Sequence, residues 1–331
     1  MSQSVSHLAY RKGVSHYLVR NNNRGLSDPE IVKIDLWHDR AMNTTTQTSA
    51  LPDDDDEGPA TPQDTRKELL QFTARHYTQI RHVFVQLPDR DKPRPSMVGH
   101  MVHERKHRAL ILYLLLLTIW PWLKERRDPF EAAIWLRALD SSDVPDSPSG
   151  TTWSSSTLSR AWTDLGDMGL VTTKRESRLV RVTPRREDGG DDYTTPGGRK
   201  DRWNVYFTLP EEFWLEGWFA KLSLPALAML LTIAKETSNQ PETRLPYESA
   251  PEWYGISPKS AQKGLKELDE HNLLHIRIET KKSALSPTGK TVRFWYSLTG
   301  EFGYTARVAR QAAAAKAANK KKSAKKAPKI S

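Results

Sequence analysis

Apolar residues form two long runs that predict buried helices. Residues 109–123 are almost all apolar, and basic residues flank them on both sides. As a helix these fifteen residues would rise about 22 Å, less than the hydrocarbon thickness of roughly 30 Å. Residues 224–236 form the second run, and Pro225 stands in its first turn, where a missing N–H is tolerated. We expect two core helices and no membrane-spanning segment.

A third stretch, residues 259–271, has the pattern of an amphipathic helix. Its apolar residues recur at i, i+4 and i+7 and predict one inward face: Ala261, Leu265 and Leu268. Ser257 and Pro258 precede it as an N-cap and a first helical residue, which is a helix-start signal. The opposite face carries lysines at helical spacing.

The chain contains an internal repeat. Residues 158–171 match residues 261–274, and residues 206–209 match residues 295–298 at a shorter offset. The loop at residues 187–201, rich in Gly and Asp, accounts for the difference between the two offsets. Two copies of one structural unit are therefore expected.

Each copy predicts the same order of elements: an apolar helix, a short second helix, a turn, an amphipathic helix, and two strands joined by a basic loop. Gly169 and Asn272 end the two amphipathic helices in positions that favour a left-handed residue. The predicted strands are residues 170–173 and 203–209 in the first copy and residues 273–280 and 291–298 in the second, with residues 179–182 as a further strand inside the first loop. The first copy also inserts residues 140–153 before its amphipathic helix.

These patterns divide the chain into four parts. Residues 1–96 are expected to be an N-terminal extension, with an unstructured acidic linker around residues 53–57 and a helix at residues 69–85. The two copies occupy residues 97–213 and 214–306, and residues 307–331 form a basic tail rich in Lys and Ala. We expect Trp214 and Trp218 to pack between the copies. The fold class expected is α+β and mainly helical.

Composition narrows the function classes. The chain of 331 residues has a formal charge of +10, which favours a polyanionic partner such as nucleic acid. It has no cysteine, which excludes disulfides, thiol nucleophiles and zinc sites built on Cys. No apolar run typical of a signal peptide follows Met1. These features favour a cytoplasmic, nucleoid-associated protein.

Candidate chemistry for catalysis or metal binding is sparse. His100, His103 and His107 would share one helix face, but they stand among Lys and Arg and are better interpreted as a basic helix start. The sequence has no His-x-His pair, no phosphate-binding loop and no Gly-x-Ser-x-Gly motif. We therefore expect no enzyme activity, no cofactor and no metal.

Residues 255–274, with their counterpart at residues 155–171, resemble the winged helix-turn-helix superfamily, as in MarR- and GntR-like regulators. The resemblance covers roughly residues 100–305. It implies two tandem winged helix-turn-helix domains, in which the third helix enters the major groove of double-stranded DNA and the basic loop, or wing, lies across the backbone. The tandem order also resembles plasmid replication initiators of the iteron-binding kind.

The resemblance implies DNA-contacting residues on both third helices and both wings. In the first copy they are Ser155, Ser156, Ser159, Arg160, Thr163, Lys174, Arg175, Arg178 and Arg181. In the second copy they are Lys259, Ser260, Gln262, Lys263, Lys266, Lys281, Lys282, Lys290 and Arg293. Arg160 suits a guanine and Gln262 an adenine. In the first wing Arg185 and Arg186 add further positive charge.

The positive charge is concentrated at the C-terminal end. Residues 307–331 hold nine basic residues and no acid, so the rest of the chain is nearly neutral. We expect this tail to be helical over residues 308–318 at most and to bind phosphates without reading sequence. The tail lysines concerned are Lys320, Lys321, Lys322, Lys325 and Lys326.

The expected function is sequence-specific binding of double-stranded DNA in transcriptional regulation. One alternative is a plasmid or mobile-element replication initiator that binds repeated origin sites. An alternative of another class is a structural or protein-interaction module, since winged helices also serve as partner surfaces. A homodimer is compatible with each of these functions. A membrane partner is not expected.

Overall fold

A computed structural model of the chain describes residues 58–73, 75–88, 96–147, 152–197, 201–245 and 247–326. All of them belong to one compact unit, Gly58–Ser331. The fold is α+β and mainly helical, with about 48% helix and small antiparallel sheets, as expected. The acidic linker around residues 53–57 lies outside the described residues.

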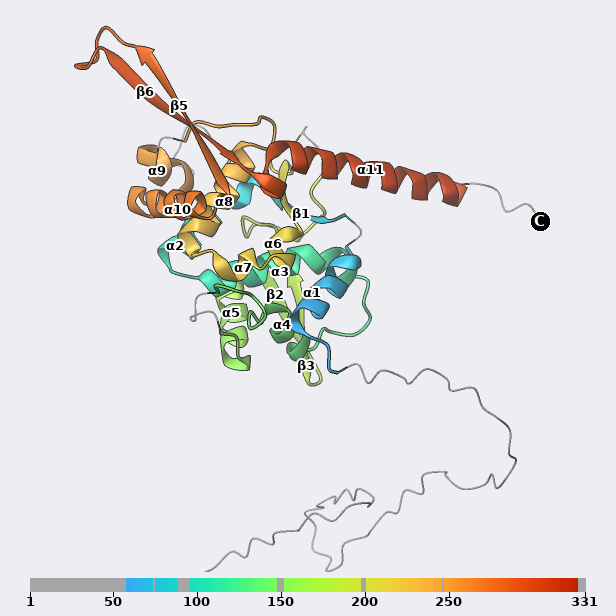
Figure 1. Cartoon of the computed structure of the whole chain (residues 1–331). Coiled ribbons are helices and arrows are strands. Elements are labelled where there is room, and N and C mark those ends of the chain that lie inside the picture. The colour runs from blue at the N-terminus through green and yellow to red at the C-terminus, as the bar shows by residue number, and fades with distance from the viewer. Residues whose placement is uncertain are drawn as a thin grey trace, which may run out of the picture. The chain divides into compact units, whose positions relative to one another are not determined.

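The first part of the unit consists of short helices and short strands around one long helix (Figure 1). In chain order the elements are α1 (Pro62–Gln71), β1 (Tyr77–Arg81), a 3-10 turn (His82–Phe84), α2 (Met97–His103), α3 (His107–Leu123), α4 (Ala132–Leu139), α5 (Ser155–Asp167), β2 (Val171–Glu176), β3 (Leu179–Pro184) and β4 (Tyr206–Pro210).

The second part repeats the order of helix, short helix, helix and hairpin. Its elements are α6 (Glu212–Leu215), α7 (Trp218–Lys221), α8 (Leu224–Glu236), a 3-10 turn (Tyr247–Ser249), α9 (Ala250–Tyr254), α10 (Pro258–Glu270), β5 (Leu274–Lys282), β6 (Lys290–Leu298), a 3-10 turn (Gly300–Phe302) and α11 (Tyr304–Lys326). The helices and strands predicted for the second copy are confirmed to within a few residues.

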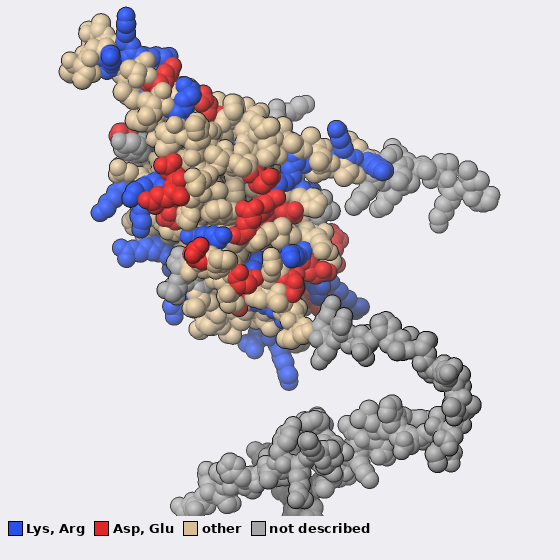
Figure 2. Space-filling model, viewed as in Figure 1, with Lys and Arg blue, Asp and Glu red and all other residues tan. Residues whose placement is uncertain are grey.

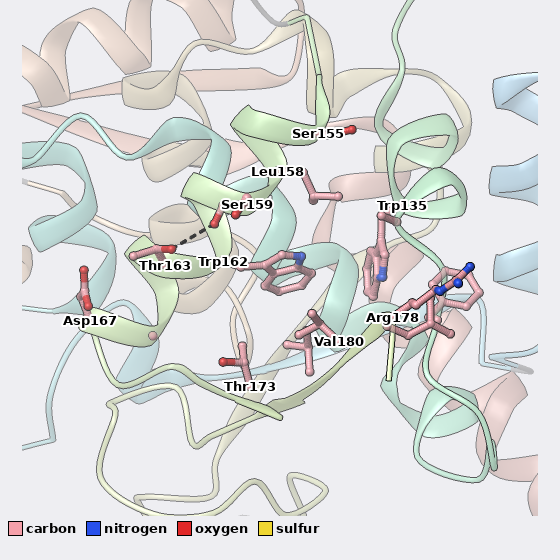
Figure 3. Close-up of a pocket in the computed structure, with 15 residues that line it drawn as sticks. Trp135, Ser155, Leu158, Ser159, Trp162, Thr163, Asp167, Thr173, Arg178 and Val180 are labelled. Carbon is pink, nitrogen blue, oxygen red and sulfur yellow. Dashed lines mark hydrogen bonds between the residues drawn. The ribbon is translucent and has the colours of Figure 1, made fainter. Parts of the chain in front are cut away.

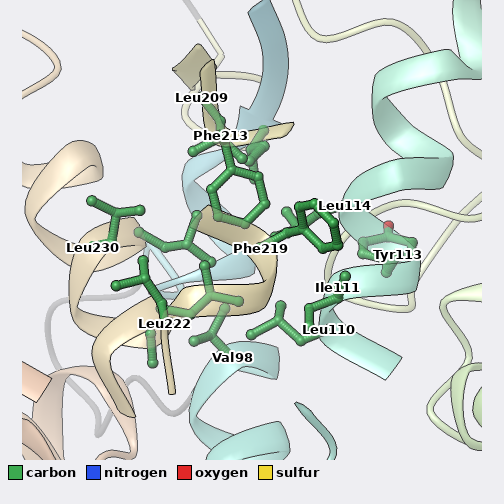
Figure 4. Close-up of a cluster of buried hydrophobic side chains, with 14 of the residues drawn as sticks. Val98, Leu110, Ile111, Tyr113, Leu114, Leu209, Phe213, Phe219, Leu222 and Leu230 are labelled. Atoms are coloured by element: carbon green, nitrogen blue, oxygen red, sulfur yellow. The ribbon is translucent and has the colours of Figure 1, made fainter. Parts of the chain in front are cut away.

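The two apolar runs are the centre of a single core. Helix α3 is buried from Ala109 to Ile119 and α8 from Ala226 to Ala234, which confirms the predicted core helices. Figure 4 shows side chains of α2, α3, β4 and α8, and of the short helices between β4 and α8, meeting in this core: Val98, Leu110, Ile111, Tyr113, Leu114, Leu209, Phe213, Phe219, Leu222 and Leu230. Among the described residues no helix combines the length and the apolar character that a membrane span needs.

The predicted helix at residues 69–85 is wrong. Helix α1 ends at Gln71, and His76 adopts a left-handed conformation (φ 61°) that no helix interior accommodates. The chain then forms β1, which pairs antiparallel with β4 from Tyr77 opposite Pro210 to Arg81 opposite Tyr206. Residues from Gly58 onward are therefore part of the folded unit, so the body does not begin near residue 97.

The first hairpin is also shorter than predicted. Strand β2 pairs with β3 around a two-residue turn, Ser177 and Arg178, whereas the sequence predicted residues 203–209 as the closing strand. Residues 206–210 form β4 instead, which pairs with β1, and the loop between β3 and β4 is bonded to β1 as well. Arg81 and Glu187, both fully buried, form an ion pair at 2.7 Å, and Arg81 also donates to Thr194 O at 2.6 Å.

The two copies are joined through close contacts. A Cβ added at Gly99 of α2 would lie 2.1 Å from the carbonyl oxygen of Tyr254, at the end of α9. Ser96 Oγ donates to the same carbonyl oxygen at 3.0 Å. Trp214 is buried between the copies, as expected, and its Nε1 donates to Thr118 Oγ1 of α3 at 3.2 Å, whereas the ring contacts of Trp218 are with His271 and Phe302 of its own copy. The copies are therefore held in one relative position.

The C-terminal helix is longer than predicted. Helix α11 runs from Tyr304 to Lys326, beyond the expected end near residue 318, because Ala and Lys are strong helix formers. Its first turn is anchored by Arg307, which is 3% exposed and donates to Ala234 O at 2.8 Å and to Thr237 O at 3.0 Å. Arg310 pairs with Glu212 at 2.7 Å. The first two cations of the basic tail are therefore structural.

Candidate nucleic-acid interface

Helix α10 is fixed tightly on its inner side. Ser257 caps it by accepting a hydrogen bond from Ser260 N at 3.1 Å, as the sequence predicted. A Cβ added at Gly264 would lie 2.3 Å from Pro225 O, so the helix backbone approaches α8 as closely as only glycine allows. Glu267 accepts a hydrogen bond from Ser223 N at 2.6 Å. The outer face of α10 is therefore presented in one orientation.

That outer face is polar and cationic. Lys259, Gln262, Lys263 and Lys266 are exposed. Lys266 pairs with Glu270 at 3.2 Å, whereas Lys259 and Lys263 form no ion pair with any residue that the structure describes. Ser260 is half-buried, and its hydroxyl accepts from Ser257 Oγ at 2.9 Å. The predicted third-helix residues of the second copy thus lie together on one exposed face.

The hairpin β5–β6 follows α10 and projects beyond the helices (Figure 1). Lys281, Lys282 and Lys290 are exposed near its tip, and Arg293 is half-buried. Lys281 pairs with Glu279 at 3.3 Å, and Trp295 Nε1 donates to the same carboxylate at 3.0 Å. Figure 2 shows Lys and Arg gathered at the far end of this hairpin and along the outer part of α11, while acids gather over the middle of the face shown.

Helix α5 presents the corresponding face in the first copy. Ser154 caps it, and Lys106 pairs with Asp164 at 2.8 Å, which ties α5 to the segment between α2 and α3. All five of its predicted contact residues are exposed on this outer side: Ser155, Ser156, Ser159, Arg160 and Thr163. The hydroxyl of Thr163 donates to Ser159 O at 3.1 Å. As expected, left-handed residues follow the ends of both helices: Gly169 after α5, with φ 70°, and Asn272 after α10, with φ 56°.

Two groups of cations are found in the first hairpin. Lys174, Arg175 and Arg178 are exposed, as a phosphate-binding surface requires. Arg181, in contrast, donates to both oxygens of Glu176, at 3.0 and 2.9 Å, and to Arg127 O at 2.5 Å. These hydrogen bonds with Arg181 lower the pKa of Glu176, which keeps the pair ionised. Arg181 therefore braces the hairpin.

The remaining cations of this segment are engaged internally as well. Arg186 pairs with Asp188 at 2.7 Å and with Asp191 at 2.5 Å. Arg185 donates to Gly190 O at 3.0 Å. The sequence suggested a run of six cations along the wing between residues 174 and 186. Folding leaves three of them directed to solvent.

A cavity that the sequence did not predict lies between α4, α5 and the first hairpin (Figure 3). It has a volume of about 510 Å³, and its apolar wall includes Trp135, Trp162 and Val180. The rings of Trp135 and Trp162 meet edge to face with centroids 5.2 Å apart. Four predicted DNA contacts also line it: Ser155, Ser159, Thr163 and Arg178. The sequence predicted residues 179–182 only as a strand, and that pattern does not signal a cavity.

The lysines of the basic tail extend the same chemistry. Lys320 is exposed on α11. Lys321, Lys322, Lys325 and Lys326 belong to the same helix, and their side chains lie outside the described part of the structure.

The three histidines considered for metal binding have separate environments. His103 contacts the Glu104 carboxylate at 2.9 Å at the surface. Burial, helped by the charge of Arg108, lowers the pKa of His107 to about 4, so its imidazole is neutral at pH 7. No group of three His, Asp or Glu side chains suited to a metal ion occurs within the described ranges.

Comparison of the chain with protein-family models, with curated proteins and with solved structures finds no match.

Proposed function

We propose that the protein binds double-stranded DNA in a sequence-dependent manner through two winged helix-turn-helix units, and that it acts in transcriptional regulation. The observation that carries the proposal is the repeated placement of an exposed polar helix directly before a basic hairpin. In both copies the cations lie on the side that the core leaves uncovered. If these residues only kept the protein soluble, a polar helix followed by a basic hairpin would not be expected in both copies.

The side chains on the two helices suit the two kinds of contact that a DNA reader makes. Gln262 on α10 can form paired hydrogen bonds with the N6 and N7 positions of adenine, and Arg160 on α5 with O6 and N7 of guanine. Lys259 and Lys263 have the exposure and the charge needed for phosphate contacts, which fix orientation without reading bases. Lys282 and Lys290 would add phosphate contacts from the second hairpin.

The fixed junction between the copies supports binding of both units to one duplex. Gly99 and Ser96 contact the end of α9 directly, and both copies share one hydrophobic core. Two helices that are held rigidly relative to each other can enter major grooves only at one separation along the duplex. The proposal therefore includes a fixed spacing between two recognition sequences.

The experiment that tests the proposal is a salt titration of duplex binding. The full chain would be compared with the double variant Lys259→Ala/Lys263→Ala, using duplexes enriched from a random-sequence pool. Removal of each lysine–phosphate interaction should reduce the slope of log K against log salt by about 0.9, so we expect a reduction of about 1 to 2. The affinity at moderate salt should fall at least tenfold.

A matched control removes the same charge elsewhere. Lys67 is exposed on α1 and Lys124 just after α3, and neither belongs to α10 or to the hairpin β5–β6 that follows it. Lys67→Ala/Lys124→Ala should keep the salt slope within experimental error. Equal behaviour of the two double variants would contradict a role of α10 as a DNA-contacting helix.

A further inference from the structure

One face of the hairpin β5–β6 is apolar from the body to the tip. At its base Leu274 lies opposite Leu298 and Ile276 opposite Tyr296, and these residues pack on the core. Further out, on the same face, Ile278 lies opposite Phe294, and Thr280 lies opposite Val292. Ile278 is 62% exposed, Val292 51% and Phe294 43%, so the apolar face extends into solvent beyond the residues that pack on the core.

The tip carries the most exposed apolar side chain of the described residues. Leu285 is 99% exposed in the loop that joins the two strands. Half of the exposed large apolar side chains in the described ranges lie on this one hairpin. Such a concentration on a projecting element marks an interaction surface, since isolated exposed apolar residues need no explanation but a contiguous strip does.

The tip loop holds Leu285 in place. Ser283 N donates to Gly289 O at 2.9 Å and Gly289 N donates to Ser286 O at 2.9 Å. Ser286 Oγ donates to Lys290 O at 2.8 Å. A loop closed by these bonds loses little conformational freedom on binding, which favours insertion of its apolar residue into a partner.

The charges around the strip identify the chemistry of the partner. Residues 274–298 contain five Lys or Arg and one acid, and two of these cations, Lys282 and Lys290, lie opposite each other on the face of the strip near the tip. That acid, Glu279, lies on the opposite face, where Lys281 and Trp295 hold it. The surface that the strip contacts must therefore be polyanionic at its edges and apolar inside. A second copy of the chain fits poorly, because contact between two tips would bring like charges together.

Duplex DNA has both properties in its minor groove. Phosphates border the groove, and the stacked bases lie within it; proteins that insert Leu, Ile or Phe between base pairs from this side kink the duplex by roughly 20–90°. A two-stranded ribbon is an established shape for groove contacts. The first hairpin lacks these features, because its two-residue turn carries Ser177 and Arg178.

We infer that hairpin β5–β6 is a wedge: Leu285 inserts between base pairs from the minor groove while Lys282 and Lys290 contact the flanking phosphates, so that binding bends the DNA. The inference rests on the proposed function and adds DNA bending to it. Steps that unstack readily, such as TA, should be preferred at the point of insertion.

The test measures bending and binding separately. Duplexes enriched for binding and labelled with a donor and an acceptor at the two ends would report the bend by energy transfer, and anisotropy would report the affinity of the full chain. The wild type should raise the transfer efficiency. Leu285→Ser should keep the affinity within about tenfold, because the lysines remain, and should lose most of the bend.

Two control variants isolate the apolar contact at the tip. Leu285→Met keeps an apolar side chain and should keep the bend. Val180→Ser alters the 44% exposed apolar residue of the first hairpin and should also leave the bend unchanged. Circular dichroism would verify that each variant is folded, which is expected for changes at exposed positions.

The possible results separate the wedge from the proposed function. Wild type that binds duplexes without bending them, or Leu285→Ser that bends them as the wild type does, would overturn the wedge alone. Wild type that enriches and binds no duplex would contradict the proposed function. Loss of binding to phosphatidylserine vesicles in Leu285→Ser, with duplex bending unchanged, would assign the tip to a membrane surface and overturn the wedge.

Discussion

The buried pair of Arg81 and Glu187 gives a sharp test of how the first copy is assembled. Neither side chain is exposed, and the two approach at 2.7 Å. Glu187 Oε1 also accepts from the backbone N of Arg81 at 3.1 Å, and Arg81 Nε donates to Asn204 Oδ1 at 3.1 Å. These bonds connect β1 to the loop that the sequence assigned to the wing.

The change Glu187→Gln removes the negative charge and keeps the shape. It leaves the guanidinium of Arg81 buried without a counter-charge, and removing one partner of a buried pair costs about 3 to 5 kcal/mol. We expect a loss of unfolding free energy in that range. The melting temperature should fall by roughly 10 °C, since about 1 kcal/mol corresponds to 2–4 °C for a chain of this size.

The assay is urea and thermal unfolding followed by circular dichroism. The double variant Arg81→Met/Glu187→Leu replaces the pair by apolar side chains of similar volume and should recover most of the lost stability. Below the melting temperature, Glu187→Gln should bind duplexes with an unchanged salt slope, because the loop is not part of the hairpin β2–β3. A loss below about 1 kcal/mol, or a changed salt slope, would refute this reasoning.

Three further predictions concern packing, pH and the tail. Gly264→Ala should lower the free energy of unfolding by at least about 2 kcal/mol and weaken duplex binding, because its Cβ would lie 2.3 Å from Pro225 O. Gly166→Ala, which has open space around it, should raise the free energy of unfolding by about 0.5 kcal/mol. Urea unfolding midpoints would measure both changes, and equal effects would contradict the close approach of α10 to α8. Burial lowers the pKa of His82 and of His107 from 6.5 to about 4, so the unfolded chain binds protons at a higher pH than the folded chain does. The stabilisation should therefore be complete above pH 6.5 and should decrease by up to about 3 kcal/mol per histidine as the pH drops to 4. Urea unfolding midpoints of His107→Leu that depend on pH as steeply as those of the wild type would contradict this prediction. Removal of residues 316–331, which contain seven lysines, should lower the affinity for all duplexes and reduce the salt slope. The preference for one sequence over another, measured by competition with unrelated duplexes, should stay unchanged. An altered preference would contradict a tail that binds phosphates alone.

The sequence was most informative where structure is determined locally. The start of α10 could be predicted because Ser257 and Pro258 are cap signals, and its inner face could be predicted because Ala261 and Leu265 follow helical spacing. The long core helix α3 needed only its length and composition. Gly169 and Asn272 could be predicted to end helices because these two residue types adopt the left-handed conformation readily, whatever surrounds them.

The errors arose where distant segments decide the structure. Nothing near Tyr77–Arg81 signals that this strand pairs with Tyr206–Pro210, because the register depends on residues far apart in the chain. The loop between β3 and β4 has the composition of a wing insertion, whereas Glu187 in that loop is buried beside Arg81. The anchor of α11 could not be predicted either, because Arg307 binds carbonyl groups of α8 and its C-cap, which are about 70 residues away in the chain.

The candidate interface was predictable in part. Charge and helical spacing indicated the outward faces of α5 and α10, and the structure places those side chains on the surface. They could not indicate which cations are used internally, so Arg181 was assigned to DNA although the carboxylate of Glu176 holds it. The apolar strip of β5–β6 was missed because alternating apolar residues in a strand normally predict burial.

Sequence-dependent binding by two rigidly joined units can be tested by enrichment of bound duplexes from a random-sequence pool by the full chain, followed by sequencing. We expect two short sequence clusters separated by one fixed spacing, because Gly99 and Ser96 hold the two copies against each other. Insertion of about five base pairs, half a helical turn, between the clusters should abolish high-affinity binding. A pool with no enriched sequence would contradict sequence-dependent binding of DNA by this protein.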